Sequence, residues 1–247
     1  MLLAIDIGNS AIKFGVFEGN DLTDKFSIPT SRDMTSANIA DKIKDRFKLP
    51  VEAAIACSVV PEIEAALTEY LSASSGVVPR FVSSSDVLGL EISFDVSTTG
   101  TDRLVNSFAA AERYGAPCIV VSLGTATTID VVNRKRQYLG GLIAPGINVG
   151  IQALAFAASK LPAVEIHKPE TAIATTTETA IQSGVIYGQI AMVEGLLKRL
   201  ISELGDEPKV VATGGFSGII ADEVTAIDVV DTELLLNGLR LIADRVF

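Results

Sequence analysis

Residues 1–10, MLLAIDIGNS, run directly into residues 11–17, AIKFGVF, and this stretch decides the fold. It is typical of an apolar strand that ends at Asp6, a tight turn that opens at Gly8, and a second strand that returns at once. A buried strand seldom ends on an unpaired carboxylate, because a charge without a partner in the interior is costly. The hairpin therefore indicates a phosphate-binding turn, in which backbone N–H groups face an anion and Asp6 addresses a metal or its water shell. An ordinary hairpin with a Gly-Asn turn is the alternative.

Composition limits the function classes. The chain has 247 residues, of which 48% are hydrophobic, enough for one large domain or two small ones. A formal net charge of −10 argues against a general nucleic-acid binder, because no basic stripe is available to neutralise phosphates. The single histidine, His167, excludes His-based zinc sites and leaves little room for a Ser-His-Asp triad. Cys57 and Cys118 lie far apart in apolar, strand-like segments, which is typical of reduced core thiols.

Neither a membrane span nor a secretory signal is predicted. The longest uncharged run, 137–159, contains four glycines and a proline, which is unlike a membrane-spanning helix. The first residues lack the basic region of a signal peptide, and Asp6 interrupts their apolar run. We therefore expect a cytoplasmic protein without a membrane or nucleic-acid partner.

Hydrophobic periodicity predicts an internal repeat. The first half is expected to form strands at about 2–7, 11–17, 22–28, 52–57 and 79–83, with helices near 35–47, 61–72 and 102–114. The pattern restarts at residues 117–130, again an apolar strand, a turn at Gly124-Thr125 and a returning strand. The rest of the second half is expected to form strands at 138–142, 208–212 and 226–230, and helices after Gly146, at 177–203, after Gly215 and at 232–246.

Both halves follow the order β-β-β-α-β-α-β-α. This predicts two similar three-layer α/β domains, residues 1–115 and 116–247, with a cleft between them. Each half carries its own phosphate turn, and both turns are expected to point into the cleft. The alternative is a single mixed α/β domain with two unrelated hairpins.

Six motifs follow one another along the chain. They are DIGNS at 6–10, GTDR at 100–103, GTATT at 124–128, GGLIAPG at 140–146, TETAIQSG at 177–184 and ATGG at 212–215. The set resembles type III pantothenate kinase, of the acetate and sugar kinase, Hsp70 and actin superfamily. The resemblance implies two RNase H-like (actin-like ATPase) domains, each a mixed sheet flanked by helices. It also implies a homodimer that uses Mg²⁺ and a monovalent cation, K⁺ or NH₄⁺, to transfer the γ-phosphoryl group of ATP to pantothenate, the first step of coenzyme A biosynthesis.

Residues that bind the nucleotide can be assigned by this resemblance. Asp6 is expected to hold Mg²⁺ through water, and Lys13 to add a positive charge unless it simply faces solvent. Phosphate oxygens are expected to be bound by Gly8, Asn9 and Ser10 in the first turn and by Gly124 and Thr125 in the second. Adenine or ribose is expected to approach the backbone at Gly214 and Gly215, which follow an apolar strand.

The residues expected to bind the acceptor are Gly100, Thr101, Asp102, Arg103 and Thr177. Asp102 is the candidate general base, and a helix N-cap is its structural alternative. Gly100 would allow close approach of the substrate, and Arg103 would pair either with the pantothenate carboxylate or with Asp102. Thr177 matches a threonine that the family offers from the neighbouring subunit, and it too could be a helix N-cap.

Two departures from the family pattern bear on function. Ser122 stands where the family has an aspartate that helps hold the monovalent cation, so weaker cation binding is expected. The family usually has an aromatic residue and a proline in the segment before GTDR, whereas segment 93–99 contains Phe94 but no proline. The identity of the acceptor is therefore less certain than the binding of ATP. A non-catalytic or regulatory nucleotide-binding relative and a kinase of another small hydroxy acid are therefore the alternatives. The apolar helix expected after Gly146 fits either a core helix or a dimer interface.

Overall fold

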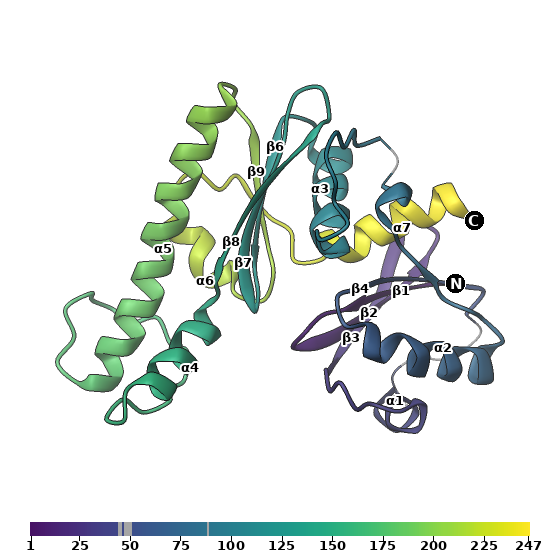
Figure 1. Cartoon of the computed structure of the whole chain (residues 1–247), viewed down its shortest axis with the longest axis horizontal. Coiled ribbons are helices and arrows are strands. Elements are labelled where there is room, and N and C mark those ends of the chain that lie inside the picture. Colours follow the sequence, from purple (N-terminus) through teal and green to yellow (C-terminus); the bar gives the residue numbers. More distant parts are fainter. Residues whose placement is uncertain (44–45, 47–50, 88) are drawn as a thin grey trace. The chain divides into compact units, whose positions relative to one another are not determined.

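The computed structural model describes residues 1–43, 46, 51–87 and 89–247, so positions 44–45 and 47 of the expected helix 35–47 lie outside the described residues. The chain divides into two compact units (Figure 1). Unit 1 comprises Met1–Ala109 and Glu233–Phe247, and unit 2 comprises Ala110–Thr232. The division differs from the expected one at 115, because the C-terminal helix packs on the sheet of the N-terminal unit.

Unit 1 is built on a five-stranded mixed sheet with the order β3-β2-β1-β4-β5. Strands β1, β2 and β3 are antiparallel neighbours, whereas β4 and β5 run parallel to β1. The strands are β1 (Leu2–Ile7), β2 (Ala11–Glu18), β3 (Asp21–Pro29), β4 (Ala53–Ser58) and β5 (Arg80–Phe81). The helices are α1 (Ser36–Ile43), α2 (Pro61–Ser75), the 3₁₀ turn η1 (Ser84–Asp86), α3 (Thr101–Tyr114), which continues into unit 2, and α7 (Leu234–Val246).

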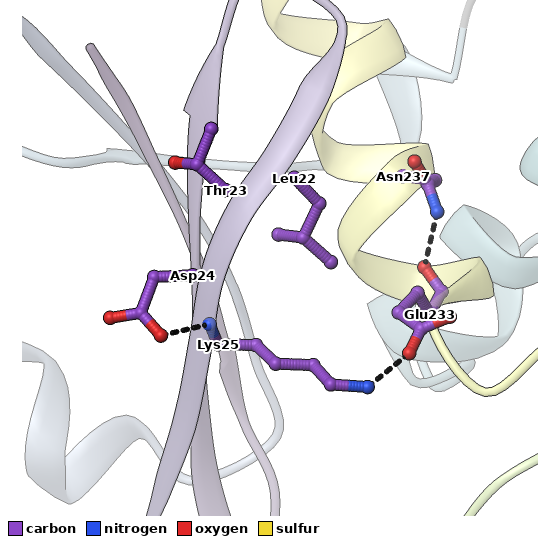
Figure 2. Close-up of a pocket in the computed structure, with 6 residues that line it drawn as sticks. All are labelled: Leu22, Thr23, Asp24, Lys25, Glu233 and Asn237. Atoms are coloured by element: carbon purple, nitrogen blue, oxygen red, sulfur yellow. Dashed lines mark hydrogen bonds and ion pairs between the residues drawn. The ribbon is translucent and has the colours of Figure 1, made fainter.

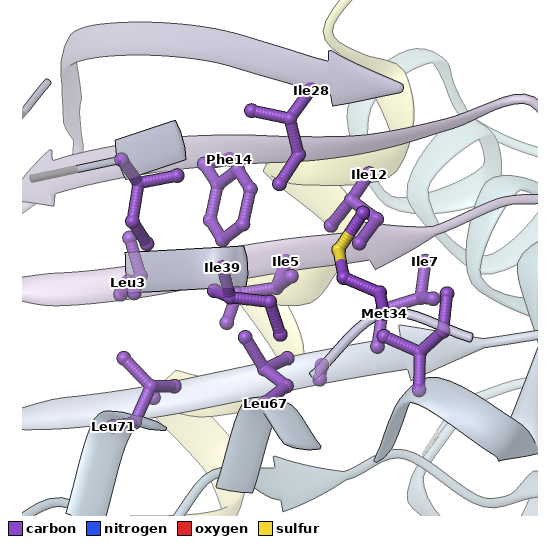
Figure 3. Close-up of a cluster of buried hydrophobic side chains, with 14 of the residues drawn as sticks. Leu3, Ile5, Ile7, Ile12, Phe14, Ile28, Met34, Ile39, Leu67 and Leu71 are labelled. Atoms are coloured by element: carbon purple, nitrogen blue, oxygen red, sulfur yellow. The ribbon is translucent and has the colours of Figure 1, made fainter. Parts of the chain in front are cut away.

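Strand alternation separates the two faces of this sheet. One face buries large aliphatic and aromatic side chains, among them Leu3, Ile5 and Phe14, against α1 and α2 (Figure 3). Helix α2 fits this role, because Pro61 opens it and Ile63, Leu67 and Leu71 line its buried side. The chemistry-bearing residues of β1, β2 and β4 alternate with the core positions, and so they project from the opposite face.

Helices α3 and α7 lie at that opposite face. Helix α7 packs against β1, β2 and β4. A Cβ atom at Gly15 would come within 3.1 Å of Leu236, and one at Gly238 within 2.9 Å of Val105 and Ala109. The absence of side chains at these two glycines therefore lets α7 pack closely on β2 and on α3. The start of α3 is thereby fixed on the face of the sheet that carries Asp6.

Unit 2 repeats the same architecture. Its sheet has the order β10-β9-β6-β7-β8, so that β6 corresponds to β1 and the β6–β7 hairpin to the β1–β2 hairpin. This confirms the predicted pair of similar α/β domains. The elements are β6 (Cys118–Leu123), β7 (Ala126–Val132), β8 (Tyr138–Pro145), α4 (Ile147–Ala157), α5 (Thr177–Leu204), β9 (Lys209–Thr213), α6 (Ser217–Ile220), η2 (Ala221–Glu223) and β10 (Val229–Val230). No helix among the described residues is long and apolar enough to span a bilayer.

Candidate active site

The first phosphate turn joins β1 to β2. Gly8 N donates to Ala11 O at 3.1 Å and closes the turn, while the side chains of Asn9 and Ser10 lie exposed at its tip. Thr30, just after β3, donates from Oγ1 to Gly8 O at 2.7 Å. Sequence reasoning missed Thr30, because no spacing links it to a turn 22 residues earlier in the chain. The loop is therefore held by a hydroxyl from the residue that follows β3, and not by its own residues alone.

Asp6 forms an ion pair across the hairpin. The register places it opposite Lys13, and Lys13 Nζ donates to Asp6 Oδ2 at 3.2 Å. Burial raises the pKa of the Asp6 carboxyl, and the charge of Lys13 acts in the opposite direction. The Lys13 side chain is half exposed, so its ammonium group both pairs with the carboxylate and remains accessible. The pair with Asp6 was not among the roles considered for Lys13, and the predicted contact of Lys13 with phosphate stays a prediction.

The same face brings Asp102 into the neighbourhood of Asp6. Asp6 is the register partner of Cys57 on β4, and Cys57 Sγ lies 3.3 Å from Oγ1 of Thr101, the first residue of α3. The pKa of the Cys57 thiol is raised well above its usual range, first by burial and then by the charges of Asp6 and Asp102. Both predicted carboxylates therefore act on one buried thiol within unit 1.

The Asp102 carboxylate lies directly over Gly100. A Cβ atom at residue 100 would lie 2.4 Å from Asp102 Oδ1, so a larger residue there would make this side chain shift from its present position. Since α3 begins at Thr101, the residue at its N-cap position is Gly100, and Asp102 lies inside the first turn. A carboxylate there is favoured by the helix dipole but does not cap the helix. The capping alternative for Asp102 therefore has no support in this geometry.

In unit 2, three glycine turns meet at the ends of β6 and β9. Gly146 N donates to Thr125 O at 3.2 Å, and a Cβ atom at Gly146 would lie 2.4 Å from the same oxygen. Gly214 has a φ of +94°, and a Cβ atom there would lie 2.4 Å from Leu123 O. The backbone at Gly146 and the backbone at Gly214 therefore pack directly against the backbone of the second phosphate turn, Gly124-Thr125, and of Leu123 before it. Because no side chains lie between these segments, this end of the sheet is lined by peptide groups.

Replacement of Gly214 by alanine is expected to lower the free energy of unfolding by at least about 1–3 kcal/mol, because a positive φ and a backbone clash act together. Gly215→Ala is the matched control, since a Cβ atom there meets nothing within 4 Å. Thermal and denaturant unfolding of both variants would measure the difference. Equal stability of the two variants would contradict the packing described for the turn.

Ser122 occupies the position that Asp6 has in unit 1, two residues before the turn glycine. Its register partners are Thr128 on β7 and Thr213 on β9, so hydroxyl groups meet at this level of the sheet. The same face also carries Asp130, a buried carboxylate that accepts a hydrogen bond from Tyr138 Oη at 2.7 Å. At the position of Ser122 itself, unit 2 therefore presents neutral oxygens where unit 1 presents the Asp6 carboxylate.

Thr177 is the exposed first residue of α5. The cap of this helix is Thr176, whose Oγ1 accepts a hydrogen bond from Thr179 N at 3.1 Å. The capping alternative for Thr177 was therefore wrong by one residue. Its side chain has no role as the cap, which leaves the predicted contact with substrate as a proposal.

A cavity of about 500 Å³ in unit 1 lies apart from these residues (Figure 2). Residues 22–25 of β3 and the start of α7 line it, and Lys25 Nζ pairs there with Glu233. Leu22 pairs with Phe17 on β2, at the end of the hairpin opposite the Gly8 turn. None of the predicted site residues lines this cavity.

Comparison with known proteins relates this arrangement to a family. A family model described as type III pantothenate kinase matches residues 2–199. Two proteins named type III pantothenate kinase are similar over nearly the whole chain. The one from Halalkalibacterium halodurans is 39% identical and covers 98% of both chains, and the one from Myxococcus xanthus is 41% identical and covers 99% of this chain and 98% of its own.

A solved structure shares the fold. The inorganic polyphosphate/ATP-glucomannokinase from Arthrobacter sp. strain KM superposes with a TM-score of 0.51 at 15% identity, covering 99% of this chain and 98% of its own. At this identity the likeness concerns the fold alone. The two mixed sheets flanked by helices are thus the pair of domains found in actin-like ATPases and sugar kinases.

Proposed function

The chain belongs to the type III pantothenate kinase family, and we propose which of its residues carry out the phosphoryl transfer. The enzyme is an ATP-dependent pantothenate kinase of coenzyme A biosynthesis, which transfers the γ-phosphoryl group to pantothenate and gives 4′-phosphopantothenate. The observation that carries the residue assignment is that Asp6, which pairs with Lys13, and Asp102 both act on the buried thiol of Cys57 in unit 1.

Asp102 acts as the general base in this proposal. Phosphoryl transfer depends mainly on positioning and on charge neutralisation, so the base need only orient the attacking hydroxyl and accept its proton late. The hydroxyl oxygen forms the new P–O bond, the bond from the γ-phosphorus to the bridging oxygen breaks, and its electron pair leaves with ADP. The Gly100–Arg103 turn, Thr101 included, binds the acceptor, and the Arg103 guanidinium pairs with its carboxylate or orients Asp102.

The nucleotide is bound mainly by backbone groups. In unit 1 the turn amides of Gly8, Asn9 and Ser10 bind phosphate oxygens, and the half-exposed ammonium of Lys13 adds charge. In unit 2 we assign the β- and γ-phosphates to Gly124 and Thr125, and adenine or ribose to Gly214 and Gly215. The backbone packing of these turns supports the assignment, because it leaves peptide groups at the end of the sheet.

The donor set of the site fits Mg²⁺ held through water at Asp6. Among the described residues no three His, Cys, Asp or Glu side chains gather into a metal-binding group. Mg²⁺ usually keeps several waters and uses one or two carboxylates plus substrate phosphates, which a lone buried Asp6 with ATP would supply. When bound, the ion neutralises charge on the phosphate oxygens.

The monovalent cation is proposed to bind weakly, because Ser122 contributes no charge. Exchanging K⁺ for Na⁺ is expected to change the wild-type rate little, whereas Ser122→Asp is expected to make the rate depend on K⁺ or NH₄⁺. The neutral variant Ser122→Asn is the matched control and should gain no such dependence. Steady-state rates in each salt measure this, and a wild-type K⁺ response as strong as that of Ser122→Asp would contradict it.

The proposed homodimer uses an apolar surface of unit 2. We propose that this surface includes Leu139 and Ile143 on β8 and Val149, Leu154 and Phe156 on α4, each of which is exposed in the single chain. The Phe156 side chain is 94% exposed in the single chain, which is unusual because phenylalanine is among the residue types most often buried. Exposed apolar patches of this kind mark interfaces between proteins. In the dimer, Thr177 would be offered to the acceptor site of the partner subunit.

Phe156→Asp is expected to weaken the dimer by about 2 kcal/mol or more, roughly 30-fold in its dissociation constant, because it puts a charge at an aromatic anchor. Val78→Asp in unit 1 is the control, since Val78 is also exposed but lies outside this surface. Light scattering across a concentration series measures both variants. A dimer unaffected by Phe156→Asp would remove the surface from the proposal.

A direct assay tests the function. ADP release that depends on pantothenate is expected, with little or no release when other small hydroxy acids replace it. Ser122 favours one alternative, a regulatory relative that binds ATP without turnover. Calorimetric binding of ATP with no turnover of pantothenate in any salt would support that alternative.

A further inference from the structure

The junction between β4 and α3 contains a contact that the proposed roles do not use. Thr101 Oγ1 donates to Ser58 O at 3.2 Å and lies 3.3 Å from Cys57 Sγ. Cys57 and Ser58 end β4, whereas Thr101 begins α3, more than 40 residues later in the chain. One hydroxyl therefore ties the start of a helix to the end of a strand.

Hydrogen counting gives the direction of these bonds. Ser58 O can only accept, so it takes the single hydroxyl hydrogen of Thr101. The thiol of Cys57 is then left as the donor to Thr101 Oγ1. The chain runs from the Cys57 S–H to Thr101 Oγ1, and from the Thr101 O–H to Ser58 O. Both polar groups are engaged within the protein.

The junction connects the two carboxylates of the site. Asp102 follows Thr101 directly, in the first turn of α3. Cys57 is the register partner of Asp6 across the parallel β1–β4 pair, and Ser58 is the partner of Ile7. The position of the helix start relative to β1 is therefore set through this junction. A shift of about 1 Å at such a point can slow a reaction about 100-fold.

We propose that Thr101 and Cys57 form a positioning pair, which holds Asp102 at its working distance from Asp6 and the bound phosphate. The proposal rests on the roles assigned above to Asp102 and Asp6. It also refines the role of Thr101, since a hydroxyl already bonded to Ser58 and Cys57 acts on Asp102 rather than on pantothenate. Any contact of Thr101 with the acceptor would then come from its backbone.

Thr101→Val, which keeps the shape and removes the hydroxyl, tests the pair. We expect kcat to fall about tenfold to 100-fold while KM for ATP and for pantothenate changes little. Thr101→Ser should recover most of kcat, because it restores the hydroxyl. Thr68→Val is the matched control, since Thr68 Oγ1 also donates to a backbone carbonyl, at 2.8 Å, within α2 and away from the site. It should leave both constants near the wild-type values.

The cysteine provides a second, independent arm. Cys57→Ala should lower kcat about fivefold, which corresponds to the loss of one typical hydrogen bond. Cys57→Ser should restore most of kcat, because serine keeps a hydrogen-bond donor at this position. The double variant with Thr101→Val should be no slower than Thr101→Val alone, because both changes break one chain. ATP binding by calorimetry checks that each variant is folded. If Thr101→Val does not fold, the pair of Cys57 variants decides.

Three outcomes overturn the proposal. A raised KM for pantothenate with unchanged kcat in Thr101→Val would mean that the hydroxyl contacts the acceptor directly. Unchanged kcat in both Thr101→Val and Cys57→Ala would mean that the junction has no positioning role. Strictly additive losses in the double variant would mean that the two side chains act separately. Failure of the role assigned to Asp102 is recognised independently, because Asp102→Asn would then remain active, and failure of the kinase function is recognised by a wild type that does not turn over pantothenate.

Discussion

Replacing Asp102 by asparagine is expected to reduce kcat by about 10²–10⁴-fold, the usual contribution of a positioned general base. Asparagine has nearly the same shape, so it should still fit above Gly100, where a Cβ atom would lie 2.4 Å from Asp102 Oδ1. It cannot accept the proton of the attacking hydroxyl. ATP should therefore bind with little change, while pantothenate-dependent ADP release is almost lost. Calorimetry and a coupled assay measure the two quantities separately.

Asp24→Asn is the matched control for this variant. Asp24 is an exposed carboxylate of unit 1 that accepts a hydrogen bond from Lys25 N and lies outside the predicted site. Its replacement should leave the rate near that of the wild type. A kcat for Asp102→Asn within a few-fold of the control would mean that another group accepts the proton.

Asp6→Asn is expected to abolish Mg²⁺-dependent turnover, by at least about 10³-fold, because metal-ion stabilisation of the transition state amounts to several kcal/mol. The affinity for Mg²⁺ and ATP together should fall, whereas metal-free ATP should be affected much less. Binding titrations with and without Mg²⁺ distinguish the two effects. Asp6→Asn activity that remains near the wild-type value would place the metal elsewhere.

The same variant should be more stable than the wild type at neutral pH. Burial raises the pKa of Asp6 in the folded protein, so folding favours its neutral form. That contribution is present at low pH and is lost as the pH rises through the folded pKa. Asparagine, always neutral, removes this penalty, and so the gain in melting temperature should shrink as the pH is lowered. A loss of stability at neutral pH would show that the pair with Lys13 outweighs burial.

Much of the fold could be predicted because strands and hairpins have local signals. The expected strand 2–7 and the helices at 61–72 and 177–203 agree with β1, α2 and α5 to within a few residues. The packing of α7 on the sheet of unit 1 could not be predicted, because the sequence of an amphipathic helix does not indicate which sheet its apolar face will cover. The short strand β10 was expected to be longer, at 226–230, because an apolar run does not show where strand pairing ends.

The site was predictable only where its residues lie in one motif. Asp6 and Lys13 are seven residues apart, on the two strands of one hairpin, so the length of the hairpin places them opposite each other. Cys57 comes from another strand and Thr30 from the residue after β3, and their contacts depend on the register of the sheet. The capping alternative considered for Thr177 was one residue too late, because threonine occupies three successive positions, 175–177, and composition does not choose among them.

The division of the chain has a consequence for synthesis on the ribosome. All residues of unit 2 have been made once position 232 is complete, whereas unit 1 still lacks Glu233–Phe247. Domains tend to acquire structure as they emerge, in N- to C-terminal order. Here we expect the reverse order, because the sheet of unit 1 is completed on this face, beside α3, only when α7 has been synthesised. A chain that ends at residue 232 and has left the ribosome should therefore show a protease-resistant unit 2 beside an N-terminal segment that is still cleavable.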